Sequence, residues 1–166
     1  MKTKDITIIA LLTAMAVVIS ILESYFTFFL DFIPGLKLGL ANIVIIFTLY
    51  KYGFKKALLV SLTRVIVVSL LRTGFGINFL FSLSGALLSI IVMNIFKKTK
   101  LSIVGVSVIG SIFHSIGQVL IGIVILGNNN IIYYLPYLLL LSIPTGIVIG
   151  LITKLLMDRA KYLFEE

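Results

Sequence analysis

The chain contains no cysteine and no tryptophan, and only 6 of its 166 residues are Asp or Glu. Without cysteine it forms neither disulfides nor thiolate metal sites, and its single histidine cannot complete a standard zinc site. The few acids are scattered, so the sequence has no Asp-rich cluster to hold Mg²⁺ against a diphosphate. P-loop, G-x-G-x-x-G and G-x-S-x-G motifs are also missing. These absences predict a protein that is not itself an enzyme and that needs no cofactor or metal.

Apolar residues dominate what is present. Hydrophobic residues make up 60% of the chain, the mean hydropathy is +1.23, and charged residues contribute only 12%. A soluble domain carries about 25% charged residues. Apolar runs of about 17 residues or more recur along the chain, which is the length that a bilayer core demands. The sequence therefore predicts an all-α integral membrane protein, in which residues 1–166 form a single domain embedded in membrane lipid.

Short polar breaks, several of them with glycine or proline, divide the apolar sequence into six predicted transmembrane helices. These helices cover residues 5–30, 36–52, 55–71, 75–96, 101–126 and 132–157. An even number of crossings places both termini on the same side of the membrane.

The distribution of the basic residues predicts which side that is. The net charge is +8, and eleven of the 14 Lys and Arg residues fall on the side of the termini. They are Lys2, Lys4, Lys51, Lys55, Lys56, Lys97, Lys98, Lys100, Lys154, Arg159 and Lys161. By the positive-inside rule both termini are cytoplasmic, in a multi-pass protein of the cell membrane. Short basic clusters between apolar runs are typical of such topology signals, so we expect no nucleic-acid partner.

Charged residues within the predicted spans point to a site in the outer half of the bundle. Arg64 lies near the middle of the third span, where an arginine costs about 2.5–3.5 kcal/mol on insertion scales. One interpretation is structural, with Arg64 paired to Glu23 so that two helices are locked together. The other is an outward-facing cavity in which Lys37, Arg64, Arg72 and His114 bind an anionic ligand and Glu23 orients them. The two interpretations are compatible.

Three neutral residues are placed to complete this cavity: Asn42, Asn78 and Gln118. Gln118 follows His114 by one helical turn, so the two side chains share a face of the fifth span. The segment DFIPGLK, residues 31–37, is interpreted as a lid over the cavity, because its glycine permits backbone motion and its proline fixes the path of the chain.

Two pairs of small residues are spaced for close helix packing. Ala10 and Ala14 lie one turn apart near the cytoplasmic end of the first span, and Gly146 and Gly150 have the same spacing in the sixth. Small residues at this spacing let another helix approach the backbone closely. Each pair therefore serves either internal packing or the docking of another membrane subunit.

Four blocks in this order resemble the Gx transporter family, which is also labelled heptaprenyl diphosphate synthase component I. The blocks are PGLKLGLANIV, LLVSLTRV, FLFSLSGALLS and VGVSVIGSIFHSIGQ. The resemblance extends from about Ile8 to Leu151. That family is similar to the S components of energy-coupling factor (ECF) transporters, six-helix proteins with cytoplasmic termini that capture nutrients from outside. The resemblance therefore implies an ECF S-component-like bundle, whose A-x-x-x-A motif at Ala10 and Ala14 contacts a coupling subunit.

Two functional hypotheses follow. In the first, the chain is the substrate-binding subunit of an ECF-type uptake transporter and works with a coupling subunit and ATPases. Its ligand is a small anionic or amphiphilic molecule, with isoprenoid- or quinone-related compounds as candidates. In the second, the chain is a non-catalytic membrane component associated with a polyprenyl (heptaprenyl) diphosphate synthase.

Overall fold

A computed structural model describes residues 3–27 and 39–164 of the chain, and within them every regular element is helical. The main helices are α1 (Thr3–Thr27), α2 (Asn42–Tyr52), α3 (Phe54–Val68), α4 (Ile77–Phe96), α5 (Ile103–Leu126) and α6 (Leu135–Phe164). A π-helical turn, η2 (Ser69–Thr73), extends α3, and a 3₁₀ turn, η3 (Asn129–Tyr134), precedes α6. The prediction of an all-α fold is confirmed, and each main helix overlaps one predicted span.

The helices differ in their ability to cross a bilayer. Four helical segments in the described residues are long and apolar enough: Thr3–Tyr25, Ile77–Phe96, Ile103–Leu126 and Asn129–Ala160. In contrast, α2 has 11 residues and is therefore only about 16 Å long, roughly half of a 30 Å hydrocarbon core. The predicted second span begins at residue 36, and its first three residues lie outside the described part of the chain. Six complete crossings therefore stay a prediction.

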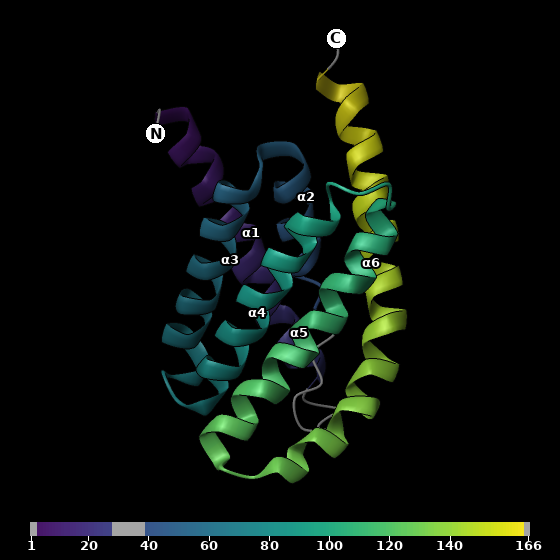
Figure 1. Cartoon of the computed structure of the whole chain (residues 1–166). Coiled ribbons are helices and arrows are strands. Elements are labelled where there is room, and N and C mark those ends of the chain that lie inside the picture. Colours follow the sequence, from purple (N-terminus) through teal and green to yellow (C-terminus); the bar gives the residue numbers. More distant parts are fainter. Residues whose placement is uncertain (1–2, 28–38, 165–166) are drawn as a thin grey trace.

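The helices form one elongated bundle in which α1 begins and α6 ends at the same end (Figure 1). α5 packs against α4 and α6, α1 packs against α3, and α2 lies against α3 and α6. The short α2 is central to the core, since it contributes the fully buried Ile45, Ile46 and Leu49. These side chains pack in one cluster with buried apolar residues of all five other main helices.

Small residues bring α4, α5 and α6 into close contact. A Cβ added at Gly117 of α5 would lie 2.9 Å from the Cα of Gly85 in α4, and one at Gly146 of α6 would lie 2.8 Å from the Cα of Val108 in α5. The hydroxyl of Ser107 donates a hydrogen bond of 2.7 Å to the carbonyl of Gly146. The Gly146 pair predicted from spacing therefore serves packing within the bundle.

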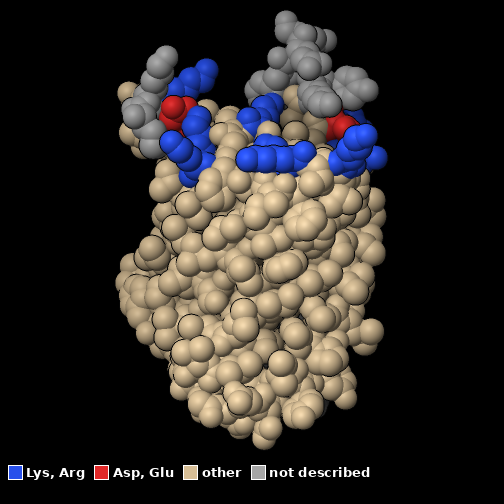
Figure 2. Space-filling model, in the orientation of Figure 1, with Lys and Arg blue, Asp and Glu red and all other residues tan. Residues whose placement is uncertain are grey.

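Charge is concentrated at one end of the molecule. On the face seen in Figure 2, Lys and Arg gather at the end where α1 begins and α6 ends, above a wide surface without charge. We call this the basic end, and its exposed residues include Lys51, Lys55, Lys98, Lys100 and Lys154. Large aliphatic side chains such as Leu70, Val124 and Leu140 are exposed elsewhere. This pattern is compatible with a multi-pass membrane protein whose sides face lipid.

Candidate functional site

Glu23 connects α1 to the beginning of α2. Its side chain is only 6% exposed. One carboxylate oxygen accepts a hydrogen bond of 2.5 Å from the backbone N–H of Gly39, and the other accepts one of 3.0 Å from Leu40. Both N–H groups belong to the two residues before Ala41, the N-cap of α2. The first N–H groups of α2 itself bond the carbonyls of Gly39, Leu40 and Ala41. The carboxylate therefore fixes the turn that leads into α2.

The short length of α2 determines where this turn lies. Because the helix extends only about 16 Å from the basic end, its first turn lies part-way along the bundle. The N-terminus of a helix carries partial positive charge, which favours a carboxylate beside it. The predicted site residue Asn42 is the first residue of α2, and its N–H bonds the carbonyl of Gly39 at 2.8 Å. Gly39 has a φ of +74°, which a glycine adopts readily.

Arg64 supplies the opposite charge. It lies on α3, is 9% exposed, and interacts electrostatically with Glu23. The structure therefore places Arg64 within electrostatic reach of Glu23, and Glu23 bonds the turn before α2. A buried charge is costly unless it is paired and hydrogen-bonded. We call this arrangement of Glu23, Arg64 and the Gly39–Leu40 backbone the charged hub; it connects α1, α2 and α3.

Arg72 belongs to η2, and its side chain contacts the C-terminal end of α1. Its guanidinium donates a hydrogen bond of 3.3 Å to the carbonyl of Ser24 and is 5.4 Å from the centre of the Tyr25 ring. Ser24 is in the last turn of α1, where carbonyl groups lack helical partners and a cation is favourable. The π turn that carries Arg72 shifts the register of α3, and such turns are frequent at functional positions. Arg72 is exposed rather than enclosed by the bundle.

The remaining predicted ligand-binding residues lie on α4 and α5. His114 is half-buried, and its ring lies so close to Gly85 that a Cβ there would be 3.0 Å from Cε1 and Nε2. The imidazole thus fills space between α4 and α5. Gln118 is half-buried one turn further along α5, and Asn78 is exposed in the first turn of α4. Lys37, with the proposed lid of residues 31–37, lies outside the described residues.

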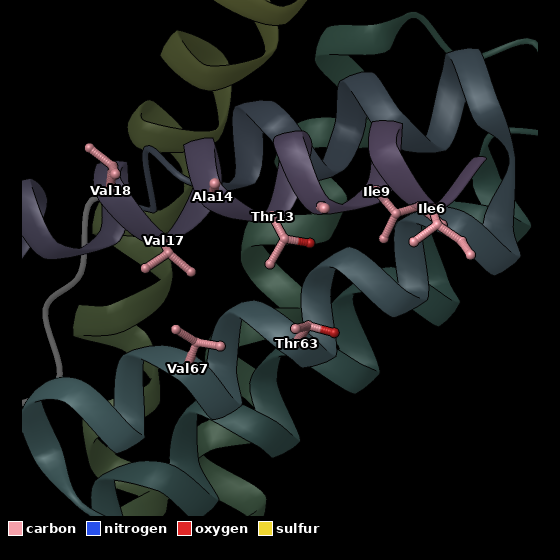
Figure 3. Close-up of a pocket in the computed structure, with 9 residues that line it drawn as sticks. Ile6, Ile9, Thr13, Ala14, Val17, Val18, Thr63 and Val67 are labelled. Atoms are coloured by element: carbon pink, nitrogen blue, oxygen red, sulfur yellow. The ribbon is translucent and has the colours of Figure 1, made fainter. Parts of the chain in front are cut away.

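Ala10 and Ala14 are both exposed and line an open groove of about 490 Å³ between α1 and α3. The other lining residues are Ile6, Ile9, Thr13, Val17, Val18, Thr63 and Val67. Thr13 and Val17 extend from α1 toward Thr63 and Val67 of α3 (Figure 3). The sequence indicated the two alanines through their spacing. It did not indicate the α3 wall, although its two residues share the same four-residue spacing.

Lys97 contributes to the basic charge that predicts the topology, and it also contacts the C-terminal end of α2. Its ammonium donates a hydrogen bond of 2.7 Å to the carbonyl of Leu49 in the last turn of α2, and lies 5.1 Å from the centre of the Tyr50 ring. Burial lowers the pKa of Lys97 from its ordinary value. The short α2 is therefore held by a carboxylate at its N-terminal end and an ammonium at its C-terminal end, matching the helix dipole.

The chain matches one family of known proteins. In the described residues no three His, Cys, Asp or Glu side chains lie close enough to hold a metal ion. A family model described as heptaprenyl diphosphate synthase component I matches residues 12–156, most of the chain. No curated protein and no solved structure matches. The resemblance read from the sequence blocks is thus confirmed at the level of the family.

Proposed function

Because the chain belongs to the heptaprenyl diphosphate synthase component I family, we propose that it is a non-catalytic membrane component of a polyprenyl diphosphate synthase. The match over residues 12–156 is the observation that carries this proposal. The sequence is compatible with it, since its six acidic residues are scattered and form no Asp-rich motif of the kind that holds Mg²⁺ against a diphosphate. In this proposal a separate subunit supplies catalysis, and this chain holds that subunit at the membrane where its apolar product accumulates.

The basic end is the surface that we assign to the catalytic subunit. In the proposed topology it faces the cytoplasm, as the positive-inside rule requires. Its exposed lysines, among them Lys98 and Lys100 in the turn between α4 and α5, project beyond the apolar sides of the bundle. A soluble subunit with an acidic surface would be attracted there, and charge complementarity mainly accelerates such association.

Co-purification tests this proposal. The tagged chain, extracted in a mild detergent, is expected to retain a polyprenyl diphosphate synthase subunit identified by mass spectrometry. The variant Lys98→Glu/Lys100→Glu should release that subunit into the soluble fraction, whereas the matched Lys98→Arg/Lys100→Arg control should keep it on the membrane. If the synthase stays on the membrane to the same extent in cells that lack this chain, the proposal fails.

A second candidate is a substrate-binding subunit of an ECF-type uptake transporter, and the charged hub favours it. Half-length helices whose N-terminus lies among buried polar groups occur at transporter binding sites, and charges at membrane depth mark functional sites by default. In this proposal the ligand is a small anionic or amphiphilic molecule. The contacts would come from Glu23, Lys37, Asn42, Arg64, Arg72, Asn78, His114 and Gln118, and Ala10 and Ala14 would contact the coupling subunit.

The same purification separates the two candidates. The transporter proposal expects a coupling subunit and ATPases in place of the synthase. It also expects their loss when Ala14 is replaced by Phe, because a bulky side chain prevents close helix approach. The transporter proposal fails if the wild-type sample contains no transporter subunit and the Ala14→Phe variant still retains a synthase. The synthase proposal would then be the remaining candidate.

A further inference from the structure

We propose that Arg72 binds the phosphate group of a membrane phospholipid, in the leaflet opposite the basic end. The sequence suggested Arg72 as a contact for an enclosed anionic ligand, but the structure leaves its side chain exposed on the surface of the bundle. The inference depends on neither function proposed above, since any phospholipid bilayer supplies this ligand.

The distance of Arg72 from the basic end places it near a membrane interface. α3 begins at the basic end and runs toward the opposite end of the bundle (Figure 1). From Phe54, the first residue of α3, to Arg72 in η2 the chain rises about 27 Å. A hydrocarbon core is about 30 Å thick, and clustered lysines mark one of its two interfaces. Arg72 therefore lies near the level of the lipid phosphates on the other side.

Exposed aromatic side chains gather at the same end of the molecule. Tyr25 lies in the last turn of α1, and Phe75 follows η2. Tyr133 and Tyr134 in η3 and Tyr137 at the beginning of α6 are also exposed, and these elements lie at the end remote from the lysines (Figure 1). Aromatic residues, tyrosine in particular, are enriched where a bilayer meets water. They support a membrane interface at this end of the bundle.

The guanidinium of Arg72 is held in place and retains donors for a ligand. It donates a hydrogen bond of 3.3 Å to the carbonyl of Ser24 and lies 5.4 Å from the centre of the Tyr25 ring. Among the described residues this is its only hydrogen bond, and no carboxylate pairs with it. A guanidinium has five N–H donors in a planar fork, which matches the oxygens of a phosphate. Arg72 can therefore bind a phosphate without giving up its contacts with α1.

The side chains next to Arg72 favour a lipid over a soluble anion. Leu70 and Leu71, which precede Arg72 in η2, are both exposed. Three successive exposed residues cover roughly half of the helix circumference, so Arg72 stands beside a surface that faces acyl chains. An arginine in this position lays its aliphatic stem along apolar side chains and extends its charge to the interface. A phospholipid contacts both the charge and the leucines, whereas inorganic phosphate contacts only the charge.

Fluorescence quenching by brominated lipids tests the inference. The native chain has no tryptophan, so Phe75→Trp supplies a single reporter three residues from Arg72. The full chain is reconstituted into vesicles of digalactosyl diacylglycerol, a bilayer lipid without phosphate. The probe is phosphatidylcholine with brominated acyl chains, and the matched probe is brominated digalactosyl diacylglycerol. We expect phosphatidylcholine to bind beside the reporter about three- to fivefold more strongly, the range for a solvent-exposed ionic contact.

Substitutions locate the site. Arg72→Gln should abolish the preference for phosphatidylcholine at the Phe75→Trp reporter, and Arg72→Lys should keep part of it, because lysine retains the charge but not the planar fork. The control reporter is Leu59→Trp, an exposed position on the same helix and about 20 Å nearer the basic end. It should show no preference between the probes. An unchanged signal there in the Arg72→Gln background also shows that this variant stays folded in the bilayer.

Three results would overturn the inference. Equal binding of both probes beside the Phe75→Trp reporter, or a preference that survives Arg72→Gln, would show that Arg72 does not hold a lipid phosphate. The same preference at the Leu59→Trp reporter would show that there is no local site. Loss of the preference when inorganic phosphate is added in excess would identify a site for a soluble anion in place of a phospholipid.

Discussion

Glu23 and Arg64 place opposite charges inside the bundle, on α1 and α3. Two opposite charges in otherwise apolar segments suggest each other as partners, because neither can stay unpaired in a bilayer core. The backbone N–H groups of Gly39 and Leu40 were not foreseeable partners of Glu23. Every residue carries such groups, and only the three-dimensional position of the turn makes these two the ones that need an acceptor.

Replacing Glu23 tests whether the charged hub stabilises the bundle. Glu23→Gln removes the charge that balances Arg64, and we expect a loss of about 3 kcal/mol because breaking one side of a buried pair leaves the other side uncompensated. The measurement is the unfolding midpoint in detergent, followed by circular dichroism.

The double variant Glu23→Gln/Arg64→Gln supplies the control. Since it removes both charges, its destabilisation should be smaller than the sum of the two single effects by about 1 kcal/mol or more. Additive effects would mean that the two side chains act independently, which contradicts the charged hub.

At the scale of elements, α2 is the least conventional helix of the bundle. Its residues are among the most buried, yet it is too short to cross a bilayer unaided. The hydrophobic runs predicted the positions of the long helices well, because a run of about 20 apolar residues is typical of a membrane-spanning helix. They did not predict that the second helix begins only at Asn42, since the preceding residues are apolar too.

Lys97→Met should destabilise α2 from its other end. The variant loses the hydrogen bond to Leu49 and the contact with the Tyr50 ring, and we expect a cost of about 1–2 kcal/mol. The lowered pKa of Lys97 adds a pH signature, because the folded state then loses this proton at lower pH than the unfolded state. Stability relative to Lys97→Met should therefore rise with pH between that lowered pKa and 10.5. Unfolding midpoints from pH 8 upward measure the difference, and identical pH curves for both proteins would contradict the burial of the Lys97 ammonium.

Gly117→Ala tests the close crossing of α4 and α5. The added methyl group would meet backbone atoms of Gly85 and Ser84 at 2.9 Å, and overpacking of this kind costs about 1–3 kcal/mol. Gly76→Ala is the matched control, because a Cβ at Gly76 meets nothing within 4 Å; its effect should stay within about 0.5 kcal/mol. Equal midpoints for the two variants would indicate that the helices separate more easily than their packing implies.

At the scale of the whole molecule, the segregation of charge was foreseeable and the groove was not. Hydropathy and the number of lysines per loop are sums over the sequence, so they can be calculated without knowing the fold. A groove depends on which helices are neighbours. The sequence offered Ala10 and Ala14 but gave no reason to choose α3 as the opposite wall, because Thr63 and Val67 resemble many other residues of the spans.

Single cysteines can establish the orientation, since the native chain has none. We expect Asn129→Cys, before α6 and remote from the basic end, to react with an impermeant maleimide on intact cells. Lys100→Cys, at the basic end, should react only after permeabilisation. The opposite labelling pattern would invert the proposed topology and remove the basic end from contact with a cytoplasmic subunit.

The brevity of α2 also has a consequence for how the protein is made. Insertion machinery recognises segments by their length and apolarity as they emerge, and an 11-residue helix falls well short of the usual 20 or so. We therefore expect α2 to enter the bilayer together with α3, to which it is joined through Gly53, as one hairpin. Lys97 follows α4 in the sequence. The hydrogen bond from Lys97 to the carbonyl of Leu49 therefore forms only when about 100 residues of the chain have been synthesised. Until then, nascent α2 has its apolar contacts with α1 and α3 and the hydrogen bonds from its preceding turn to Glu23, but no polar contact at its C-terminal end.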